Sequence, residues 1–206
     1  MKRIQFEAKT LNDQTLNYAA EELRVNKDFI ALNIIEEKKS LLGLNKSYIV
    51  EAVVDFNVIN DGIEYIRKLL ENMEIEAVIE GKMARERQVV FSIEAKENPI
   101  LIGKNGKTLD AIQTLVKNYI NLYTEEFYIV LIDIGGYKEQ RKKQLEILAT
   151  KTAMEVINSK VATKLGKMNA YERRIIHTKL SDWRDVETVS EGEEPNRYVV
   201  ITPTKK

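Results

Sequence analysis

The chain has 206 residues, of which 44% are hydrophobic and 31% charged, with 32 basic side chains against 32 acidic ones. This composition is typical of folded domains, and no run approaches the roughly 20 apolar residues that span a bilayer, so we expect a cytoplasmic protein without membrane insertion. With no cysteine and one histidine, His177, the chain offers neither disulfides nor a zinc cluster. We therefore expect no cofactor and no metal.

The neutral total hides an uneven distribution of charge. Residues 1–100 carry 14 Lys and Arg against 18 Asp and Glu, whereas residues 101–206 carry 18 against 14. Between residues 136 and 180 the imbalance reaches 11 basic against 4 acidic side chains. Such a local field attracts polyanions even on a neutral molecule. The alternative, which is commoner for charge runs, is an ordinary solvated helical surface.

The first part of the chain predicts a small α/β unit over residues 1–54. Residues 3–8 alternate apolar and polar like a strand, and helical spacing follows between Leu16 and Leu23. Runs of β-branched and aromatic residues at 29–35 and 48–54 predict two further strands. The segment between them contains Leu41, Leu42 and Leu44, which form either a partner-docking surface or a loop tucked onto its own sheet.

A second unit is expected over residues 60–134, in the order helix, two strands, helix, loop, helix, strand. Asn60-Asp61-Gly62 is expected to cap the first helix. The strands at 75–79 and 88–95 are joined by a charged turn around 81–87. The last helix precedes an apolar strand at 127–132 and buries a stripe of Leu109, Ile112, Leu115, Val116, Tyr119 and Ile120.

The loop of this unit, Gly103-Lys104-Asn105-Gly106, is the most informative part of the sequence. Glycines let another chain approach the backbone closely, and the start of a helix favours an anion through its amide groups and dipole. Lys104 and Lys107 add cationic donors. The loop is therefore suited to a phosphate backbone.

A third unit is expected over residues 136–206, after Gly135-Gly136. It comprises a helix at 137–158, a strand near 162–165, a helix near 169–180, and strands at 186–190 and 197–202 around an acidic turn. Leu145, Leu148, Ala149, Thr152 and Val156 are expected on the buried face of the long helix.

Three segments together resemble one bacterial family, the Jag proteins. The N-terminal unit with Lys38-Lys39-Ser40-Leu41-Leu42-Gly43-Leu44 is similar to the Jag N-terminal domain. The segment Ile102-Gly103-Lys104-Asn105-Gly106-Lys107-Thr108-Leu109-Asp110-Ala111 resembles the KH signature, and Arg173 and His177 match the Arg-x-x-x-His motif of an R3H domain. Their order and spacing over nearly the whole chain make the resemblance specific.

The resemblance implies an α+β protein of three small modules: a Jag N-terminal domain, a type II KH domain (αββααβ) and an R3H domain with helices on a small antiparallel sheet. It implies binding of single-stranded RNA, or single-stranded DNA, by the KH loop, with bases in a groove between the helices at 100–118 and the strand at 89–95. In the R3H domain it implies nucleic-acid contacts from a set of basic residues: Arg173, Arg174, His177, Lys179 and Arg197.

His177 has a structural alternative, in which it ties its helix to the following hairpin. The resemblance further implies a second small KH protein as partner and a regulatory or chaperone role in cell elongation, division, cell-wall biogenesis or sporulation. The sequence leaves a homodimer open.

Two other classes of function compete with RNA binding. An enzyme would need converging acids, a metal cluster or an activated nucleophile, and the sequence shows no such set and no phosphate-binding loop of the Gly-x-x-x-x-Gly-Lys-Ser/Thr type, so no catalytic residue is assigned. A protein-interaction scaffold would use the N-terminal unit, with RNA binding secondary. Its supporting feature is the leucine-rich segment at 41–44.

Overall fold

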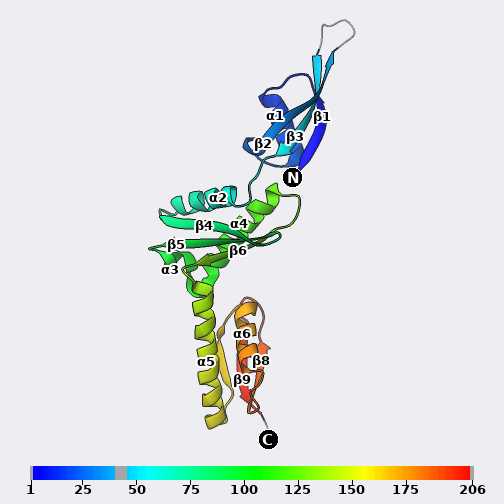
Figure 1. Cartoon of the computed structure of the whole chain (residues 1–206). Coiled ribbons are helices and arrows are strands. Elements are labelled where there is room, and N and C mark those ends of the chain that lie inside the picture. The colour runs from blue at the N-terminus through cyan, green and yellow to red at the C-terminus, as the bar shows by residue number, and fades with distance from the viewer. Residues whose placement is uncertain (1, 40–45, 205–206) are drawn as a thin grey trace. The chain divides into compact units, whose positions relative to one another are not determined.

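The computed structural model describes residues 2–39 and 46–204, so Leu41, Leu42 and Leu44 lie outside the described residues. The chain divides into two compact units, Met1–Gly135 and Gly136–Lys206. Each unit combines helices with small three-stranded sheets (Figure 1), which confirms the expected α+β class.

The N-terminal part of the first unit is a three-stranded antiparallel sheet in the order β1-β3-β2 with one helix packed on it. Asn12 begins that helix by accepting hydrogen bonds from two backbone amides of the first turn. Ala19 and Leu23 of the helix are buried against Ala52 and Val54 of the sheet. The elements are β1 (Arg3–Ala8), α1 (Asp13–Leu23), the 3₁₀ turn Lys27–Phe29, β2 (Ile30–Lys39) and β3 (Lys46–Val54).

The rest of the first unit has the expected order αββααβ. Its sheet runs β4-β5-β6, with β4 antiparallel and β6 parallel to the central β5. Phe91 of β5 is fully buried, and a Cβ at Gly62 of α2 would lie 2.5 Å from its Cζ and 3.5 Å from Ile120 Cδ1 of α4. The elements are α2 (Asn60–Glu71), β4 (Ala77–Arg85), β5 (Gln88–Ala95), α3 (Asn98–Ile102), the 3₁₀ turn Lys104–Gly106, α4 (Lys107–Tyr123) and β6 (Ile129–Ile134).

The sequence interpretation was wrong about the turn at 81–87, because β4 continues to Arg85. Gly81 lies inside the strand, and a Cβ there would lie 3.0 Å from both Ile59 Cγ2 and Phe91 Cε1. The glycine is therefore explained by close packing against these side chains rather than by a turn. The chain reverses instead at Arg87, whose φ of 56° is left-handed.

The second unit packs two helices on the three-stranded antiparallel sheet β7-β9-β8. Leu145, Ala149 and Val156 of α5 are buried with Ile176 of α6 and Ile201 of the sheet. The boundaries lie within two residues of the expected ones: α5 (Tyr137–Ser159), β7 (Thr163–Lys167), α6 (Ala170–Leu180), β8 (Val186–Glu191) and β9 (Tyr198–Pro203).

Two leucines expected in the buried stripes are exposed. Leu115 of α4 is 47% exposed and Leu148 of α5 is 40% exposed. Each directly precedes a buried residue, Val116 or Ala149, and one residue rotates a helix by about 100°. The stripes are therefore narrower than the sequence interpretation made them. Among the described residues no helix is both long and apolar enough to cross a membrane.

Candidate nucleic-acid interface

The loop between α3 and α4 is a tight left-handed turn. Gly103, Asn105 and Gly106 all have positive φ, at 68°, 56° and 76°, and α4 begins at Lys107. Asn is among the few residues with a side chain that adopts this conformation readily. The sequence thus has the residue types that the turn requires at each of these positions.

Gly103 is required for a second, steric reason. A Cβ at this position would lie 2.1 Å from Thr108 Oγ1 and 2.9 Å from Thr108 Cβ, both of which are attached to the first turn of α4. The loop backbone therefore lies directly against the start of the helix. Any side chain at position 103 would push the loop away from it.

The loop uses several of its own amide groups. Gly103 N–H donates to Pro99 O at 2.9 Å, Gly106 N–H to Gly103 O at 3.3 Å, and Lys107 N–H to Lys104 O. These three amides stabilise the turn, so they are not available to bind an anion. The side chains of Lys104, within the turn, and of Lys107, directly after it, are exposed. They supply its positive charge to solvent.

The groove expected between the helices and β5 is filled by core side chains. Val89, Phe91 and Ile93, which β5 directs at the helices, are fully buried. Leu109 and Ile112 of α4 are buried as well. The space between these helices and β5 is therefore closed by the core, whereas Ile100 of α3, close to the loop in sequence, is 60% exposed.

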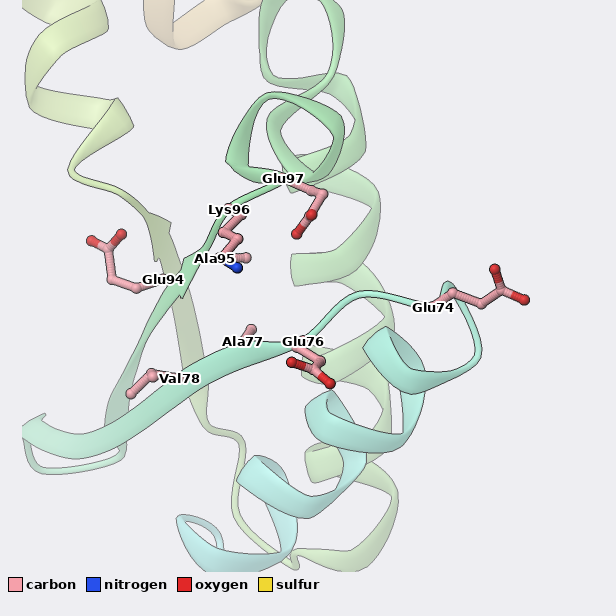
Figure 2. Close-up of a pocket in the computed structure, with 8 residues that line it drawn as sticks. All are labelled: Glu74, Glu76, Ala77, Val78, Glu94, Ala95, Lys96 and Glu97. Carbon is pink, nitrogen blue, oxygen red and sulfur yellow. The ribbon is translucent and has the colours of Figure 1, made fainter.

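A cavity of about 730 Å³ lies elsewhere in this unit, where α2 leads into β4 and β5 leads into α3 (Figure 2). Four glutamates and one lysine line it together with three small or apolar residues: Glu74, Glu76, Ala77, Val78, Glu94, Ala95, Lys96 and Glu97. This net negative lining repels phosphate groups. The cavity is therefore unsuited to a nucleic-acid backbone.

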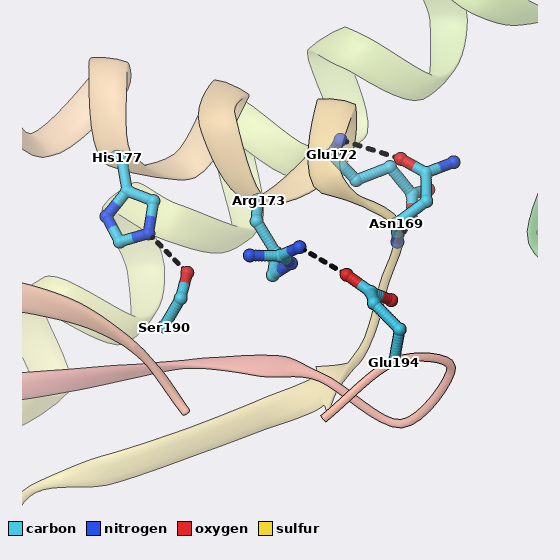
Figure 3. A network of polar contacts seen from close by, with 6 residues as sticks. All are labelled: Asn169, Glu172, Arg173, His177, Ser190 and Glu194. Carbon is cyan, nitrogen blue, oxygen red and sulfur yellow. Dashed lines mark hydrogen bonds and ion pairs between the residues drawn. The ribbon is translucent and has the colours of Figure 1, made fainter. Parts of the chain in front are cut away.

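In the second unit Arg173 and His177 lie on one face of α6, as their spacing predicted, and this face packs on the β8–β9 hairpin (Figure 3). The Arg173 guanidinium is buried and pairs with Glu194 at 2.5 Å. His177 Nδ1 lies 2.6 Å from Thr188 Oγ1 and Nε2 lies 2.8 Å from Ser190 Oγ. The structural alternative for His177 is thus confirmed, because both ring nitrogens bind the hairpin.

The environment of His177 keeps its imidazole neutral. Burial, and to a smaller extent the positive charge of Arg173, lower the pKa of His177 below its ordinary value of about 6.5. The protonated form would also need both neighbouring hydroxyl groups to act as acceptors. At neutral pH this residue therefore contributes no positive charge toward RNA.

We expect the second unit to lose stability as the pH falls from 7.5 to 5. The pKa of His177 is lower in the folded state than in the unfolded state, so the unfolded chain binds more protons as the pH falls. The contribution of neutral His177 to stability is therefore complete above about pH 6.5 and is lost as the pH falls through the folded-state pKa. Fluorescence of Trp183, the single tryptophan, reports the urea midpoint of this unit. His177→Gln should make the urea midpoint less dependent on pH. A midpoint that rises on acidification would contradict a structural role for neutral His177.

The start of α6 is fixed by a capping box with an additional ion pair. Glu172 N–H donates to Asn169 Oδ1 at 2.9 Å, and Asn169 N–H donates to Glu172 Oε2 at 3.2 Å. The second oxygen, Glu172 Oε1, accepts from Arg141 Nε of α5 at 2.7 Å. The Asn-x-x-Glu spacing was a readable signal for the cap. The partner Arg141 lies 31 residues away and had no sequence signal.

The five basic candidates of this unit do not form one surface. Arg173 and His177 face the hairpin, whereas Lys179 lines a groove with α5. Arg174 is exposed. Arg197 is half-buried directly before β9, and its Nε is buried without a hydrogen-bond partner among the described residues.

The comparisons with known proteins agree with this architecture. Residues 61–132 match the family model described as KhpA/KhpB, KH domain, and residues 143–203 match the R3H domain. The RNA-binding protein KhpB of Clostridium symbiosum is 33% identical over 98% of this chain and 92% of its own length. The protein of the same name from Bacillus subtilis is 31% identical over 92% of this chain and 93% of its own length. This chain therefore belongs to the KhpB family, the family also called Jag.

Proposed function

We propose that this protein binds single-stranded RNA at the loop formed by residues 103–107. The observation that carries the proposal is the left-handed turn at the start of the 17-residue helix α4, which presents Lys104 and Lys107 to solvent. Positive side chains and the helix dipole both favour a phosphate there. Two relatives that cover most of the chain are named RNA-binding proteins, which supports RNA over DNA as ligand.

We propose that the second unit adds weaker contacts through Arg174 and Arg197. A second module on the same chain raises the overall affinity through effective concentration, even when each module is weak alone. Arg173 and His177 act on the fold of this unit rather than on RNA, because their polar groups bind the hairpin.

Photocrosslinking tests the proposal directly. Purified full-length protein is irradiated with a 20-nucleotide single-stranded RNA, and the attached peptides are identified by mass spectrometry. We expect crosslinks in residues 98–110 and fewer in the second unit. A DNA strand of the same sequence measures the contribution of the 2′-hydroxyl group. Crosslinks confined to the N-terminal 54 residues contradict the assignment.

The proposed role is that of a cytoplasmic RNA-binding regulator in growth, division or sporulation, with binding rather than catalysis as the activity. The names of the relatives favour this role over that of a scaffold that uses the N-terminal part alone. Incubation with labelled RNA and magnesium ions checks the absence of catalysis. RNA cleavage that disappears in His177→Ala would favour an enzyme.

We further propose that α4 carries the contact with a second KH domain. Leu115 and Leu122 are 47% and 45% exposed and lie seven residues apart, hence on one side of the helix. We expect Leu115→Glu to abolish association with a small KH protein, or self-association, measured by light scattering after gel filtration. Val78→Glu, at another exposed apolar position, is the control. If both variants associate as strongly as the wild-type protein does, the contact lies elsewhere.

A further inference from the structure

Helix α5 is apolar on two sides, and its own fold covers only one of them. Leu145, Ala149 and Val156 face the core of the second unit. Ile147 and Met154, on another side, are 68% and 54% exposed. A surface helix normally presents polar side chains to water, so an uncovered apolar side indicates a partner.

The exposed pair lies in a groove between α5 and α6, two helices that run side by side in Figure 1. Its volume is about 510 Å³. Ile147 and Met154 are seven residues apart, which places them two turns and about 10 Å apart along α5. Six residues of α5 and one of α6 line the groove: Lys143, Glu146, Ile147, Thr150, Lys151, Met154 and Lys179.

The charges around the groove select an acidic occupant. Among the lining residues Lys143, Lys151 and Lys179 outnumber the one acid, Glu146. Lys143 also lies 3.7 Å from Glu139 of its own helix, at an exposed position. Thr150 donates its hydroxyl to Glu146 O at 2.9 Å, which leaves its methyl group for apolar contact. The groove thus combines the apolar side chains of Ile147 and Met154 with three basic side chains.

The shape and composition favour a peptide helix over RNA. Two apolar anchors two turns apart match the i and i+7 positions of an amphipathic helix, and methionine adapts to varied apolar partners. Sequence-tolerant RNA surfaces instead use aromatic rings on which bases stack. The seven described residues that line the groove include no aromatic side chain.

We propose that this groove binds an amphipathic helix of a partner protein, with apolar residues at i, i+3 or i+4, and i+7, and with Asp or Glu on both flanks. The apolar anchors contact Ile147 and Met154, and the acidic flanks contact the three lysines. This interaction is separate from the RNA loop at 103–107 and does not depend on it.

The probe is a fluorescein-labelled 18-residue peptide of Leu, Ala and Glu with leucine at those spacings, titrated with the full-length protein. We expect saturable binding at least tenfold tighter than that of a scrambled peptide of equal composition. Ile147→Ser with Met154→Ser should weaken it at least tenfold. Leu148→Ser, at a neighbouring exposed position outside the groove, should leave it unchanged.

Lys151→Glu with Lys179→Glu should weaken peptide binding and make it less sensitive to salt. The Trp183 urea midpoint confirms that each variant folds, since exposed substitutions change stability little. Three results overturn the proposal: equal binding of both peptides, weaker RNA binding by the Ile147 and Met154 variant, or a wild-type dimer that this variant dissociates. The second result assigns the groove to RNA, and the third assigns it to another copy of the chain.

Discussion

Replacing Lys104 and Lys107 together by glutamate is expected to lower the affinity for single-stranded RNA by at least about tenfold near 0.1 M salt. Both side chains are exposed at the loop, so the substitutions reverse the charge next to the proposed phosphates without disturbing the turn. If each lysine neutralises one phosphate, the slope of log K against log salt becomes less steep by about 1.4, because a single strand contributes about 0.7 for each contact. Fluorescence anisotropy at several salt concentrations measures both quantities.

The matched control is Lys9→Glu with Lys27→Glu, which makes the same change in net charge at two exposed positions of the N-terminal part. A general electrostatic effect would weaken RNA binding equally in both double variants. Unchanged affinity and slope in the loop variant would remove the loop from the RNA site.

Substitution of Gly103 itself is a less specific test. Gly103→Asp with Lys104→Asp should also abolish binding at the loop. However, any Cβ at position 103 would lie 2.1 Å from Thr108 Oγ1, in a backbone with a φ of 68°. Loss of binding would then report a displaced loop as well as a repelled phosphate. The lysine pair separates these two causes.

Glu172→Ala is expected to reduce the free energy of unfolding of the second unit by about 3 kcal/mol, since it removes one partner of a mostly buried ion pair and the side-chain half of a capping box. The Glu172 side chain is 5% exposed and that of Arg141 is 26% exposed. The partial exposure of Arg141 limits the loss, because its unpaired charge can still reach water. Urea unfolding followed by Trp183 fluorescence measures the change.

Two further variants separate the cap from the charge. Glu172→Gln keeps one of the two acceptor oxygens, for either the Asn169 amide or Arg141, so it should cost about half as much as alanine. Glu155→Ala, at an exposed position of α5, should change the stability by less than about 0.5 kcal/mol. If Glu172→Ala unfolds at the wild-type midpoint, the pair with Arg141 does not hold α5 to α6.

Local patterns in the sequence predicted most of the elements correctly. The helical spacing of α5 and α6 and the turn residues around β8 and β9 are short-range signals, and their boundaries lie within two residues of the structure. Gly103 and Gly106 marked the loop before α4, whereas the left-handed conformation of the turn is known from the structure. The predicted strand ended before Gly81 because a glycine is a turn signal in the sequence. Only the structure shows that Phe91 packs against this glycine.

The sequence by itself determined the order of the modules, the residue types of the loop and the shared face of Arg173 and His177, since each depends on neighbours a few positions away. Only the tertiary structure decided what that face contacts. Thr188, Ser190 and Glu194 reach it from a hairpin 11 to 21 residues further along the chain, and helical periodicity carries no information about such partners. For the same reason only the structure shows which apolar side of α5 is buried and which is exposed. Burial depends on which elements pack together, whereas the spacing of residues along the chain depends only on the geometry of one helix.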